Sequence, residues 1–341
     1  MKLKMLVFFG SSSTEHEISC RSAANILQNI DTSKYDVTKI GIDKNDEFYI
    51  YSGDIEKIKQ NKWLKDEKNK YRITNIIDFL RNYDVAFPIL HGKYGEGGKI
   101  QKIFELANIK YIGCSSLESS VAMNKLLCKK LVSSINIDVV DYVDISKEKY
   151  ENSDKKELIE NIQNKLDLPL FVKPNKEGSS YGVSKVDNIS KLYEAMKKAF
   201  TYDDTVLVEK YISDKKEIEC GVIQKDKKII VTTPGEIYSE NEVYDYYSKY
   251  SSEKSYTKIP AIIKEETKEK IKKYSKDIFK ILNLTSLARV DFFVTKEKIY
   301  FNEVNTMPGF TDISMYPKML INDGFTYTEI IDTLVDNALN K

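Results

Sequence analysis

The stretch Ala288–Phe310 constrains the fold of this chain more than any other segment. It predicts a hairpin of two β-strands whose polar turn covers residues 295–298. Asp291 lies on the first strand. Glu303 and Asn305 lie two residues apart on the second strand, so their side chains leave the same face. We therefore expect three oxygen ligands to gather on one face of the hairpin, a set that suits Mg²⁺ bound to phosphates.

The same stretch has a second interpretation, because these carboxylates fit an exposed hairpin with a solvated acidic face equally well. Arg289 and Gly309 flank the cluster and add a guanidinium group and a backbone N–H. The complete run, Arg-x-Asp-Phe-Phe followed by Asn-Glu-Val-Asn-Thr-Met-Pro-Gly-Phe-Thr, favours a functional site.

Composition excludes several classes of protein. A chain of 341 residues with 41% hydrophobic content is long enough for two or three domains. The 53 basic and 52 acidic residues leave a net charge of +1, which gives no electrostatic case for a nucleic-acid or membrane partner. The four scattered cysteines and two histidines exclude a multi-histidine metal site and predict reduced thiols in a cytoplasmic protein.

The first hundred residues predict a doubly wound α/β unit. Leu3–Phe9 is a nearly continuous apolar run, typical of a strand covered on both faces, and a small-residue loop and a helix follow it. Ligands of such units lie beyond the carboxyl ends of strands, where Glu15 and the glycine-rich loop 91–101 fall. Glu15 is either an acid facing the helix dipole or a carboxylate that grips a substrate ammonium. His91 is a site candidate only through its place on the loop.

The remainder of the chain predicts a different organisation. Residues 52–70 are rich in lysine and are expected to form a surface insertion. Residues 121–134 predict one helix whose lysines face solvent for the most part. The loop Lys173–Gly182 follows a strand and can present N–H groups to phosphate oxygens, although it lacks the Walker pattern. Glu209 and Glu217 either hold a nucleotide or are charges at strand ends.

Taken in order, these segments resemble the D-alanine–D-alanine ligases of the ATP-grasp superfamily. The resemblance covers essentially the whole chain. It is carried by six motifs: E-H-E-I-S at 15–19, H-G-x-x-G-E at 91–96, K-P-x-x-E-G-S-S-x-G at 173–182, E-K at 209–210, Y-D-Y-x-x-K-Y at 244–250, and R-x-D through S-M-Y-P at 289–317.

The resemblance implies a mixed α/β (α+β) protein with three domains of ATP-grasp type. Residues 1–120 would form an N-terminal Rossmann-like domain with a parallel sheet. Residues 121–212 would form the central ATP-grasp subdomain and residues 213–341 the C-terminal one, which would carry a lid loop near residues 239–260. ATP would lie between the central and C-terminal subdomains.

The resemblance also implies a role for individual residues, grouped here by function. The catalytic residues would be Glu15, Ser179, Tyr250, Arg289 and Gly309. The other substrate-binding residues would be His91, Ser314 and Met315. The nucleotide would be held by Lys125, Lys173, Glu209, Lys210, Ile212 and Glu217. Two Mg²⁺ ions, replaceable by Mn²⁺, would be bound by Asp291, Glu303 and Asn305.

Within the implied site, Glu15 would bind the ammonium of the first D-alanine and would share a hydrogen-bonded network with Ser179 and Tyr250 of the lid. Arg289 and the Gly309 N–H would stabilise the oxyanion.

The ends of the substrates would be bound by three further residues. His91 would lie near the carboxylate of the first amino acid, and Ser314 and Met315 would receive the carboxylate of the second.

The implied activity is ATP-dependent joining of two D-alanines through an acyl phosphate, for peptidoglycan precursor synthesis. The partners would be D-alanine and ATP, with no nucleic acid or membrane. We expect a homodimer, although the sequence leaves the oligomeric state open. Gly97, Asn124 and Ser11 depart from the family pattern and leave room for an altered activity.

Two alternatives remain at this point. A D-alanine–D-serine ligase of the vancomycin-resistance type is suggested by Cys114 and by the region from Asp43 to Trp63, whereas Met315 argues against it. A non-catalytic, nucleotide-binding regulator of ATP-grasp ancestry would be favoured by loss of metal ligands, but all three ligands are present.

Overall fold

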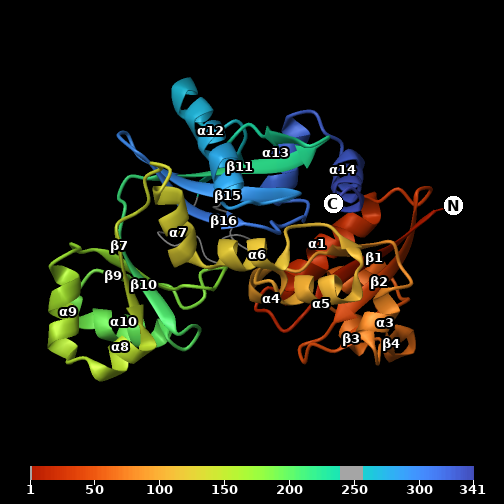
Figure 1. Cartoon of the computed structure of the whole chain (residues 1–341), viewed down its shortest axis with the longest axis horizontal. Helices are drawn as coiled ribbons and strands as arrows, with labels where there is room; N and C mark the ends of the chain where they lie inside the picture. Colours follow the sequence, from red (N-terminus) through yellow and green to blue (C-terminus); the bar gives the residue numbers. More distant parts are fainter. Residues whose placement is uncertain (1, 239–255) are drawn as a thin grey trace.

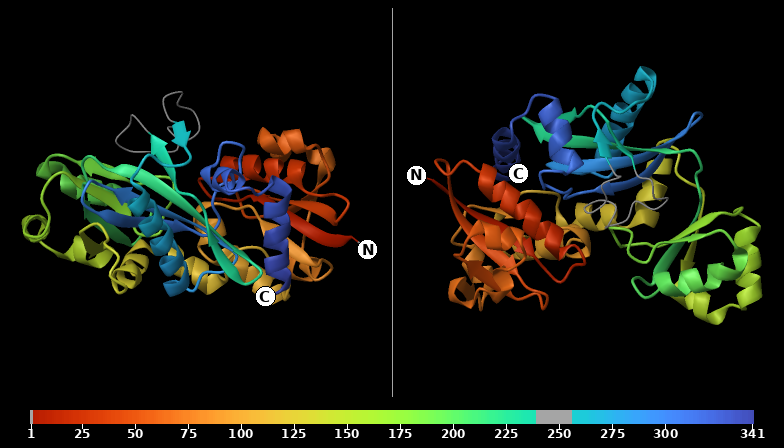
Figure 2. Two further views of the ribbon diagram at one scale, coloured as in Figure 1. Left: turned by 90° about the horizontal axis from the view of Figure 1, so that it is seen from above. Right: turned by 180° about the vertical axis from the view of Figure 1, so that it is seen from behind.

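The computed structural model describes residues 2–238 and 256–341, which form three β-sheets with helices packed on them (Figure 1). The N-terminal and central regions lie at opposite ends of the molecule, with the third sheet between them (Figure 2). Each sheet falls within one of the ranges predicted as domains, and the domain boundaries themselves stay a prediction. No helix in the described ranges is long and apolar enough to cross a membrane.

The first sheet has the strand order β4-β3-β2-β1-β5-β6, and its parallel part confirms the predicted N-terminal unit. Its strands are β1 (Leu3–Gly10), β2 (Tyr35–Ile42), β3 (Phe48–Tyr51), β4 (Lys70–Arg72), β5 (Val85–Pro88) and β6 (Lys110–Tyr111). Its helices are α1 (His16–Asn29), α2 (Ile55–Lys59), α3 (Ile76–Leu80), α4 (Gly92–Glu96) and α5 (Lys99–Ala107).

Strand β1 is buried from Met5 to Gly10, because both faces of the sheet are covered there. Met5, Val7 and Phe9 pack in a core with α1 and with the last helix of the chain, whereas Leu6 and Phe8 pack against α3 and α5. Side chains of a strand alternate between its two faces, so a strand covered on both sides is apolar at every position.

The interpretation of residues 52–70 as a surface insertion is wrong for its centre. Trp63 is fully buried and lies edge-on to Phe9 and Tyr51, with ring centroids 5.1 and 6.2 Å away. Gly41 makes room for the indole, because a Cβ at that position would lie 2.4 Å from the Trp63 ring. The single tryptophan therefore closes one end of the N-terminal core.

The central sheet is antiparallel, with the order β7-β10-β8-β9. Its strands are β7 (Tyr142–Ser146), β8 (Leu170–Pro174), β9 (Ser184–Val186) and β10 (Thr205–Lys210). Its helices are α8 (Lys147–Asn152), α9 (Lys155–Gln163) and α10 (Leu192–Ala199). Alternate residues of β8 and β10 form the core beneath these helices, which leaves Phe171, Lys173 and Glu209 on the opposite face.

The helix predicted over residues 121–134 is wrong, because two helices replace it. They are α6 (Ser116–Met123) and α7 (Lys125–Ser133). Asn124 separates them with ψ of 94°, and its side chain accepts a hydrogen bond from the Leu127 N–H at 3.0 Å. Asparagine is a strong N-cap, so this departure from the family pattern is accommodated, and the break sets Lys125 at the start of α7.

The third sheet has the order β14-β13-β11-β15-β16, and β12 pairs with β11. Its strands are β11 (Lys216–Lys225), β12 (Lys228–Val231), β13 (Gly235–Tyr238), β14 (Tyr256–Lys258), β15 (Leu287–Val294) and β16 (Ile299–Asn305). Its helices are α12 (Glu265–Ile281), α13 (Met315–Asn322) and α14 (Tyr327–Leu339). The predicted hairpin is thus confirmed as β15 and β16, which pair antiparallel.

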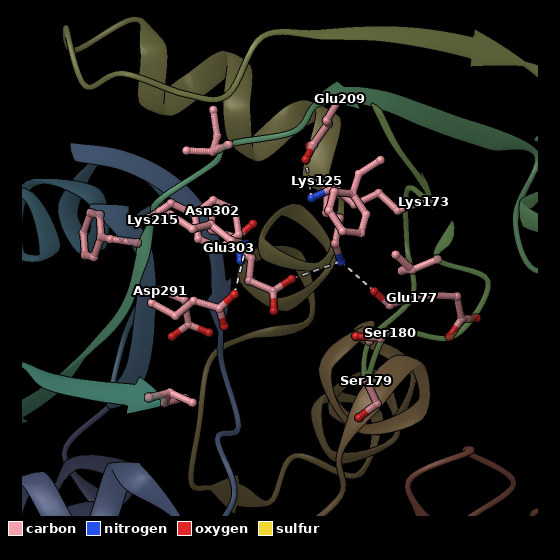
Figure 3. Close-up of a pocket in the computed structure, with 18 of the residues that line it drawn as sticks. Lys125, Lys173, Glu177, Ser179, Ser180, Glu209, Lys215, Asp291, Asn302 and Glu303 are labelled. Carbon is pink, nitrogen blue, oxygen red and sulfur yellow. Dashed lines mark hydrogen bonds and ion pairs between the residues drawn. The ribbon is translucent and has the colours of Figure 1, made fainter. Parts of the chain in front are cut away.

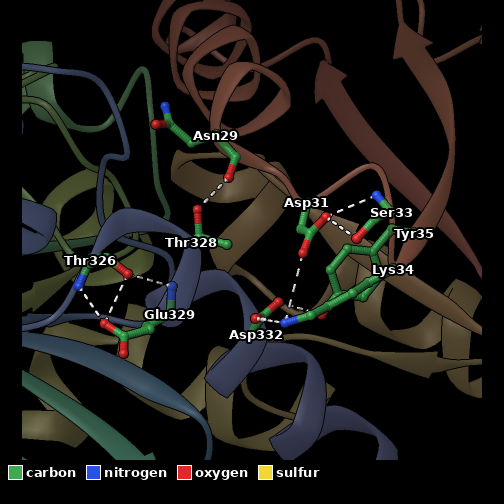
Figure 4. A network of polar contacts seen from close by, with 9 residues as sticks. All are labelled: Asn29, Asp31, Ser33, Lys34, Tyr35, Thr326, Thr328, Glu329 and Asp332. Carbon is green, nitrogen blue, oxygen red and sulfur yellow. Dashed lines mark hydrogen bonds and ion pairs between the residues drawn. The ribbon is translucent and has the colours of Figure 1, made fainter.

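Helix α14 fastens the end of the chain to its beginning. Apolar residues of α14 join the core around β1, and polar contacts surround the junction (Figure 4). Asp332 accepts hydrogen bonds from Tyr35 at 2.7 Å and from Lys34 at 2.6 Å, and the Thr328 hydroxyl donates to the Asn29 carbonyl at 3.0 Å. The N-terminal and third sheets therefore share one continuous core.

Replacement of Trp63 tests its place in that core. Because Trp63→Ala leaves a large cavity, we expect the free energy of unfolding of the N-terminal region to fall by about 3–5 kcal/mol. Tyr71→Ala, at a ring 58% exposed on neighbouring β4, is the control and should change it by less than about 0.5 kcal/mol. Urea unfolding followed by circular dichroism measures both, and equal midpoints would refute the buried position of Trp63.

Candidate active site

A cavity of about 1080 Å³, partly open to solvent, lies between the polar faces of the central and third sheets (Figure 3). Apolar residues of β11 and β15 at 218, 220, 222, 288, 290 and 292 pack toward α12, α6 and α7. The residues between them turn the other way, so the same alternation that builds the core lines the cleft.

The hairpin brings its predicted polar residues together on the cleft face. Asp291 pairs across the strands with Glu303, and Arg289 pairs with Asn305. The Arg289 guanidinium donates to both Asp291 oxygens, at 2.8 and 2.7 Å, and the Asn305 amide donates to Oδ2 at 3.0 Å. Burial lowers the pKa of Arg289, but the neighbouring carboxylates of Asp291 and Glu219 outweigh this effect and raise the pKa well above its ordinary value.

Glu219 of β11 was not predicted as part of this cluster. It is buried, pairs with Asp291 across the sheet, and holds Oε2 3.0 Å from Arg289 Nε. Its sequence signal was weak, because a glutamate in an otherwise apolar strand also fits a charge at the strand end.

The donor set fits a hard divalent cation. Asp291, Glu303 and Asn305 offer carboxylate and amide oxygens from facing strands, and the cations Arg289 and Lys125 already balance the acids. No group of three or more His, Cys, Asp or Glu side chains with metal-binding geometry occurs in the described ranges. An amide oxygen must therefore complete any site of three protein ligands here.

Lys125 stands where the cavity meets the loop 175–182. Its ammonium donates to the Glu177 carbonyl at 2.6 Å and lies 3.4 Å from Glu303 Oε2 (Figure 3). The break at Asn124 places this lysine at the first turn of α7, where helix N–H groups add a positive potential. This end of the cavity therefore suits phosphate oxygens.

Glu209 is buried beneath the same cavity with two lysines. Lys173 Nζ lies 2.6 Å from Oε2, and the fully buried Lys129 lies 3.1 Å from Oε1. Burial alone would raise the pKa of Glu209, but the two ammonium groups hold it below its ordinary value. Burial also lowers the pKa of Lys129, which Glu209 opposes.

The lysines of residues 121–134 were predicted to face solvent for the most part, and Lys129 is an exception because it is fully buried. The spacing of four residues from Lys125 puts both on one face of a helix and was the signal that could have identified it. The burial of this helix face could not be predicted, because Lys129 contacts Glu209, which lies far away in the sequence.

The other predicted nucleotide contacts also line this cavity. Lys210 is the last residue of β10, Ile212 follows the strand, and Glu217 pairs with Lys215 at 3.0 Å. Phe171 adds an apolar wall. The cavity thus combines the ammonium groups of Lys125 and Lys173 with apolar and backbone groups, a combination that suits a nucleotide.

A second cavity of about 680 Å³ adjoins the first and contains Glu15, Ser179, Arg289 and Gly309 in its lining. The two cavities share Lys125, Glu177, Gly178, Ser179 and Glu303. The predicted catalytic residues that the structure describes therefore meet beside the part of the first cavity that Lys125 lines.

Glu15 reaches this second cavity from the end of the first loop. Helix α1 begins at His16, and Glu15 is its N-cap without a capping hydrogen bond, so the side chain turns into the cavity. Its Oε1 would lie 2.9 Å from a Cβ at Gly178, which shows how closely the two loops approach. No hydrogen bond links Glu15 with Ser179 in the part of the chain that the structure describes.

Three serines on the loops beside the second cavity have positive backbone φ angles. Ser179 and Ser180 have φ of 47° and 59°, and Ser11, where the family pattern favours glycine, has φ of 95°. Such positive values are uncommon for residues with a side chain. Strain of this kind clusters at functional sites.

His91 and Glu96 border the second cavity but have protein partners. The two ring nitrogens of His91 lie 2.9 Å from the Met307 carbonyl and 3.0 Å from the Ser22 hydroxyl. Glu96 accepts the N–H groups of Gly92 and Met307, both at 3.1 Å. The resemblance gave no role to Glu96, although the glutamate belongs to the glycine-loop motif.

Two predicted residues in the described ranges are not brought to the two cavities. Ser314 is the N-cap residue of α13, and its hydroxyl accepts the Thr311 N–H at 3.0 Å. Met315 is buried in a small apolar cluster with Ile237 and Met319. Tyr250, with the predicted lid, lies outside the described residues.

Two sheets that direct lysines and carboxylates into one nucleotide-sized cleft define an ATP-grasp protein. The family profile described as "D-ala D-ala ligase C-terminus" matches residues 131–336, and "D-ala D-ala ligase N-terminus" matches residues 4–114. Together they leave little of the chain unmatched.

Individual proteins agree with the profiles. The chain is 42% identical to D-alanine--D-alanine ligases of Clostridium novyi and Clostridium acetobutylicum, over 100% of this chain and 99% of each relative. Among solved structures, the VanG D-Ala:D-Ser ligase from Enterococcus faecalis superposes with a TM-score of 0.88, 37% identity, and coverage of 99% of this chain and 100% of that one.

The D-alanine-D-alanine ligase from Coxiella burnetii gives a TM-score of 0.84 and 32% identity, with coverage of 99% and 96%. The chain therefore belongs to the D-alanine–D-alanine ligase family. Membership implies use of ATP and of a divalent metal.

Glu209→Gln tests the buried charge cluster. The substitution leaves Lys129 without its anionic partner, so we expect the free energy of unfolding at neutral pH to fall by about 3–5 kcal/mol. Because the pKa of Glu209 is lowered, its contribution is present above the unfolded pKa and is lost as the pH falls. The difference in the free energy of unfolding between Glu209→Gln and the unmodified protein should therefore shrink below about pH 4.

Urea unfolding at several pH values makes this comparison. Glu217→Gln is the matched control, since Glu217 is 29% exposed in its pair with Lys215 and should change stability by about 1 kcal/mol or less. A loss for Glu209→Gln no greater than for the control would contradict the buried cluster.

Proposed function

We propose that this chain joins two D-alanine molecules with ATP, by way of an acyl phosphate, to supply a dipeptide for peptidoglycan precursors in the cytoplasm. The observation that carries the proposal is the shared wall between the two cavities, where Lys125 and Glu303 face both. A phosphoryl group bound in the first cavity would point toward a carboxylate held in the second. Transfer of that group turns a poor acylating carboxylate into a reactive electrophile.

The nucleotide would be held by residues from both sheets. Lys125 and Lys173 would contact its phosphates, and Glu209 would fix Lys173 from below as well as approach the adenine. Lys210 and Ile212 would offer backbone groups to the base. Glu217 would accept from the ribose.

The acids of the hairpin would hold the metal. Two Mg²⁺ ions, or Mn²⁺ ions, bound by Asp291, Glu303 and Asn305 would neutralise charge on the phosphate oxygens. The support is the donor set itself, which sits beside the lysine-rich end of the cavity.

In the second cavity, Glu15 would bind the ammonium of the first D-alanine, with Ser179 and Tyr250 completing a network that excludes water. Arg289 and the Gly309 N–H would stabilise the negative charge that grows on the carbonyl oxygen when the second amine attacks. Removing one such donor typically lowers the rate by roughly 10²–10³-fold.

The second amino acid leaves one alternative open. The likeness to a D-Ala:D-Ser ligase favours D-serine as a second candidate. Ser314 and Met315 would receive the carboxylate of this amino acid. An assay of ATP-dependent phosphate release with D-alanine alone, and then with D-serine added, distinguishes the two functions when the product mass is measured. No turnover with either would overturn both and favour a regulatory protein.

Asp291→Asn tests the metal assignment. The amide keeps the shape of the side chain but removes one charge, so we expect kcat to fall on the order of 10²-fold or more, because bound metals stabilise several kcal/mol of transition-state charge. Asp144→Asn, at an exposed position of β7, should stay within about two-fold. Steady-state phosphate release measures both, and full activity of Asp291→Asn with an unchanged melting temperature would exclude Asp291 as a ligand.

A further inference from the structure

The segment Met307–Phe310, which carries Gly309, is held at both ends by residues of the N-terminal region. At its first end, His91 Nδ1 lies 2.9 Å from the Met307 carbonyl, and the Met307 N–H donates to Glu96 at 3.1 Å. At its second end, the Phe310 N–H donates to the Ser22 hydroxyl at 3.2 Å. The segment is therefore fixed by its backbone.

The Phe310 carbonyl is fixed as well. It accepts hydrogen bonds from the Asn25 amide at 2.8 Å and from the Tyr327 hydroxyl at 2.7 Å. Met307 and Phe310 thus have both of their backbone polar groups bound. Pro308 and Gly309 lie between these fixed points and face the second cavity.

The protons of this arrangement follow from the donors and acceptors. The Met307 carbonyl only accepts, so His91 Nδ1 carries the ring proton. Burial lowers the pKa of His91, so its other nitrogen is unprotonated and accepts from the Ser22 hydroxyl, which in turn accepts the Phe310 N–H. A closed chain of three hydrogen bonds therefore spans the segment and occupies both nitrogens of His91.

Glu96 links the segment Met307–Phe310 to the loop that carries Gly92. It is 9% exposed, and its two oxygens accept N–H groups from different segments, Gly92 at Oε1 and Met307 at Oε2. Burial and the charge of Glu15 raise the pKa of Glu96 to about 8, while the two N–H groups and Arg289 oppose this shift. Both carboxylate oxygens of Glu96 are therefore occupied by backbone donors, one of which belongs to the segment 307–310.

We infer that Glu96 is a positioning residue, which holds Met307 so that the Gly309 N–H points at the oxyanion beside Arg289. The inference rests on the proposed ligase reaction. It also gives His91 and Ser22 a supporting part in the same arrangement, in place of direct contact between His91 and substrate. The Gly309 N–H has no acceptor among the residues that the structure describes, which suits a group kept for the substrate.

Glu96→Gln tests this inference. A glutamine offers one carbonyl oxygen and turns an NH₂ group toward the other N–H, so one of the two backbone contacts is lost. We expect kcat to fall on the order of 10²-fold, as small displacements of catalytic groups do, while the KM for ATP stays within about two-fold. Phosphate release measured over a range of ATP concentrations separates the two constants.

Glu105→Gln is the matched control. Glu105 lies in α5 and also accepts a backbone N–H, from Ser116 at 2.9 Å, but it is exposed and lines neither cavity. Its variant should keep both kinetic constants within about two-fold.

A second measurement reads the segment directly and needs no turnover. Of the seven prolines, only Pro234 and Pro308 precede a glycine. Labelling with carbonyl-¹³C proline and ¹⁵N glycine therefore selects the amide resonances of Gly235 and Gly309 alone. In Glu96→Gln we expect the Gly309 resonance to shift or broaden while Gly235, on β13, stays unchanged.

The outcomes separate this inference from the proposed function. Inactivity of the unmodified enzyme would overturn the ligase proposal, while the resonances would still report the contact. An unmoved Gly309 resonance in Glu96→Gln, or a kcat equal to that of Glu105→Gln, would overturn the positioning role. A moved Gly309 resonance together with a reduced kcat and an unchanged KM for ATP would support it.

Discussion

The nearly buried guanidinium of Arg289 is the interaction on which the rest of the site depends. It balances Glu219 and Asp291 from two neighbouring strands, and Glu303 stands opposite Asp291 on a third. A slip of one residue in either pairing would turn these charges into the apolar layer beneath α12. Leaving a charge buried without its partner costs several kcal/mol. The pairing of charges around Arg289 therefore fixes both the strand register of the third sheet and the geometry of the site.

The remaining charges of the cleft are paired with one another. Lys125 is paired with Glu303, and Lys173 and Lys129 share Glu209. Phosphate oxygens that enter would find ammonium groups already fixed by these acids, so little reorganisation is needed to bind them. The acids prevent the lysines from repelling one another, which explains why a glutamate lies beneath a site for an anionic ligand.

The structure could be predicted best from the sequence where the alternation of apolar and polar residues along a strand also separates core residues from site residues. The hairpin of β15 and β16 and the fully covered strand β1 were predictable because alternation of side chains determines which face each residue takes. The burial of Lys129 and Trp63 was missed because it depends on partners far away in sequence, Glu209 and Phe9. The interruption at Asn124 was missed because asparagine fits a helix interior poorly but not prohibitively, and its capping bond appears only in the structure.

The wall between the two cavities makes them interdependent. Glu177 contributes its carbonyl to Lys125 of the nucleotide cavity, and its carboxylate lies 3.5 Å from Lys93 of the N-terminal region. Gly178 follows directly and lies against Glu15. A ligand that moves this loop from one side must therefore alter the site on the other side. Linkage makes the coupling reciprocal. If the proposed function is right, nucleotide and first amino acid should therefore each strengthen the binding of the other, provided that both favour this loop position.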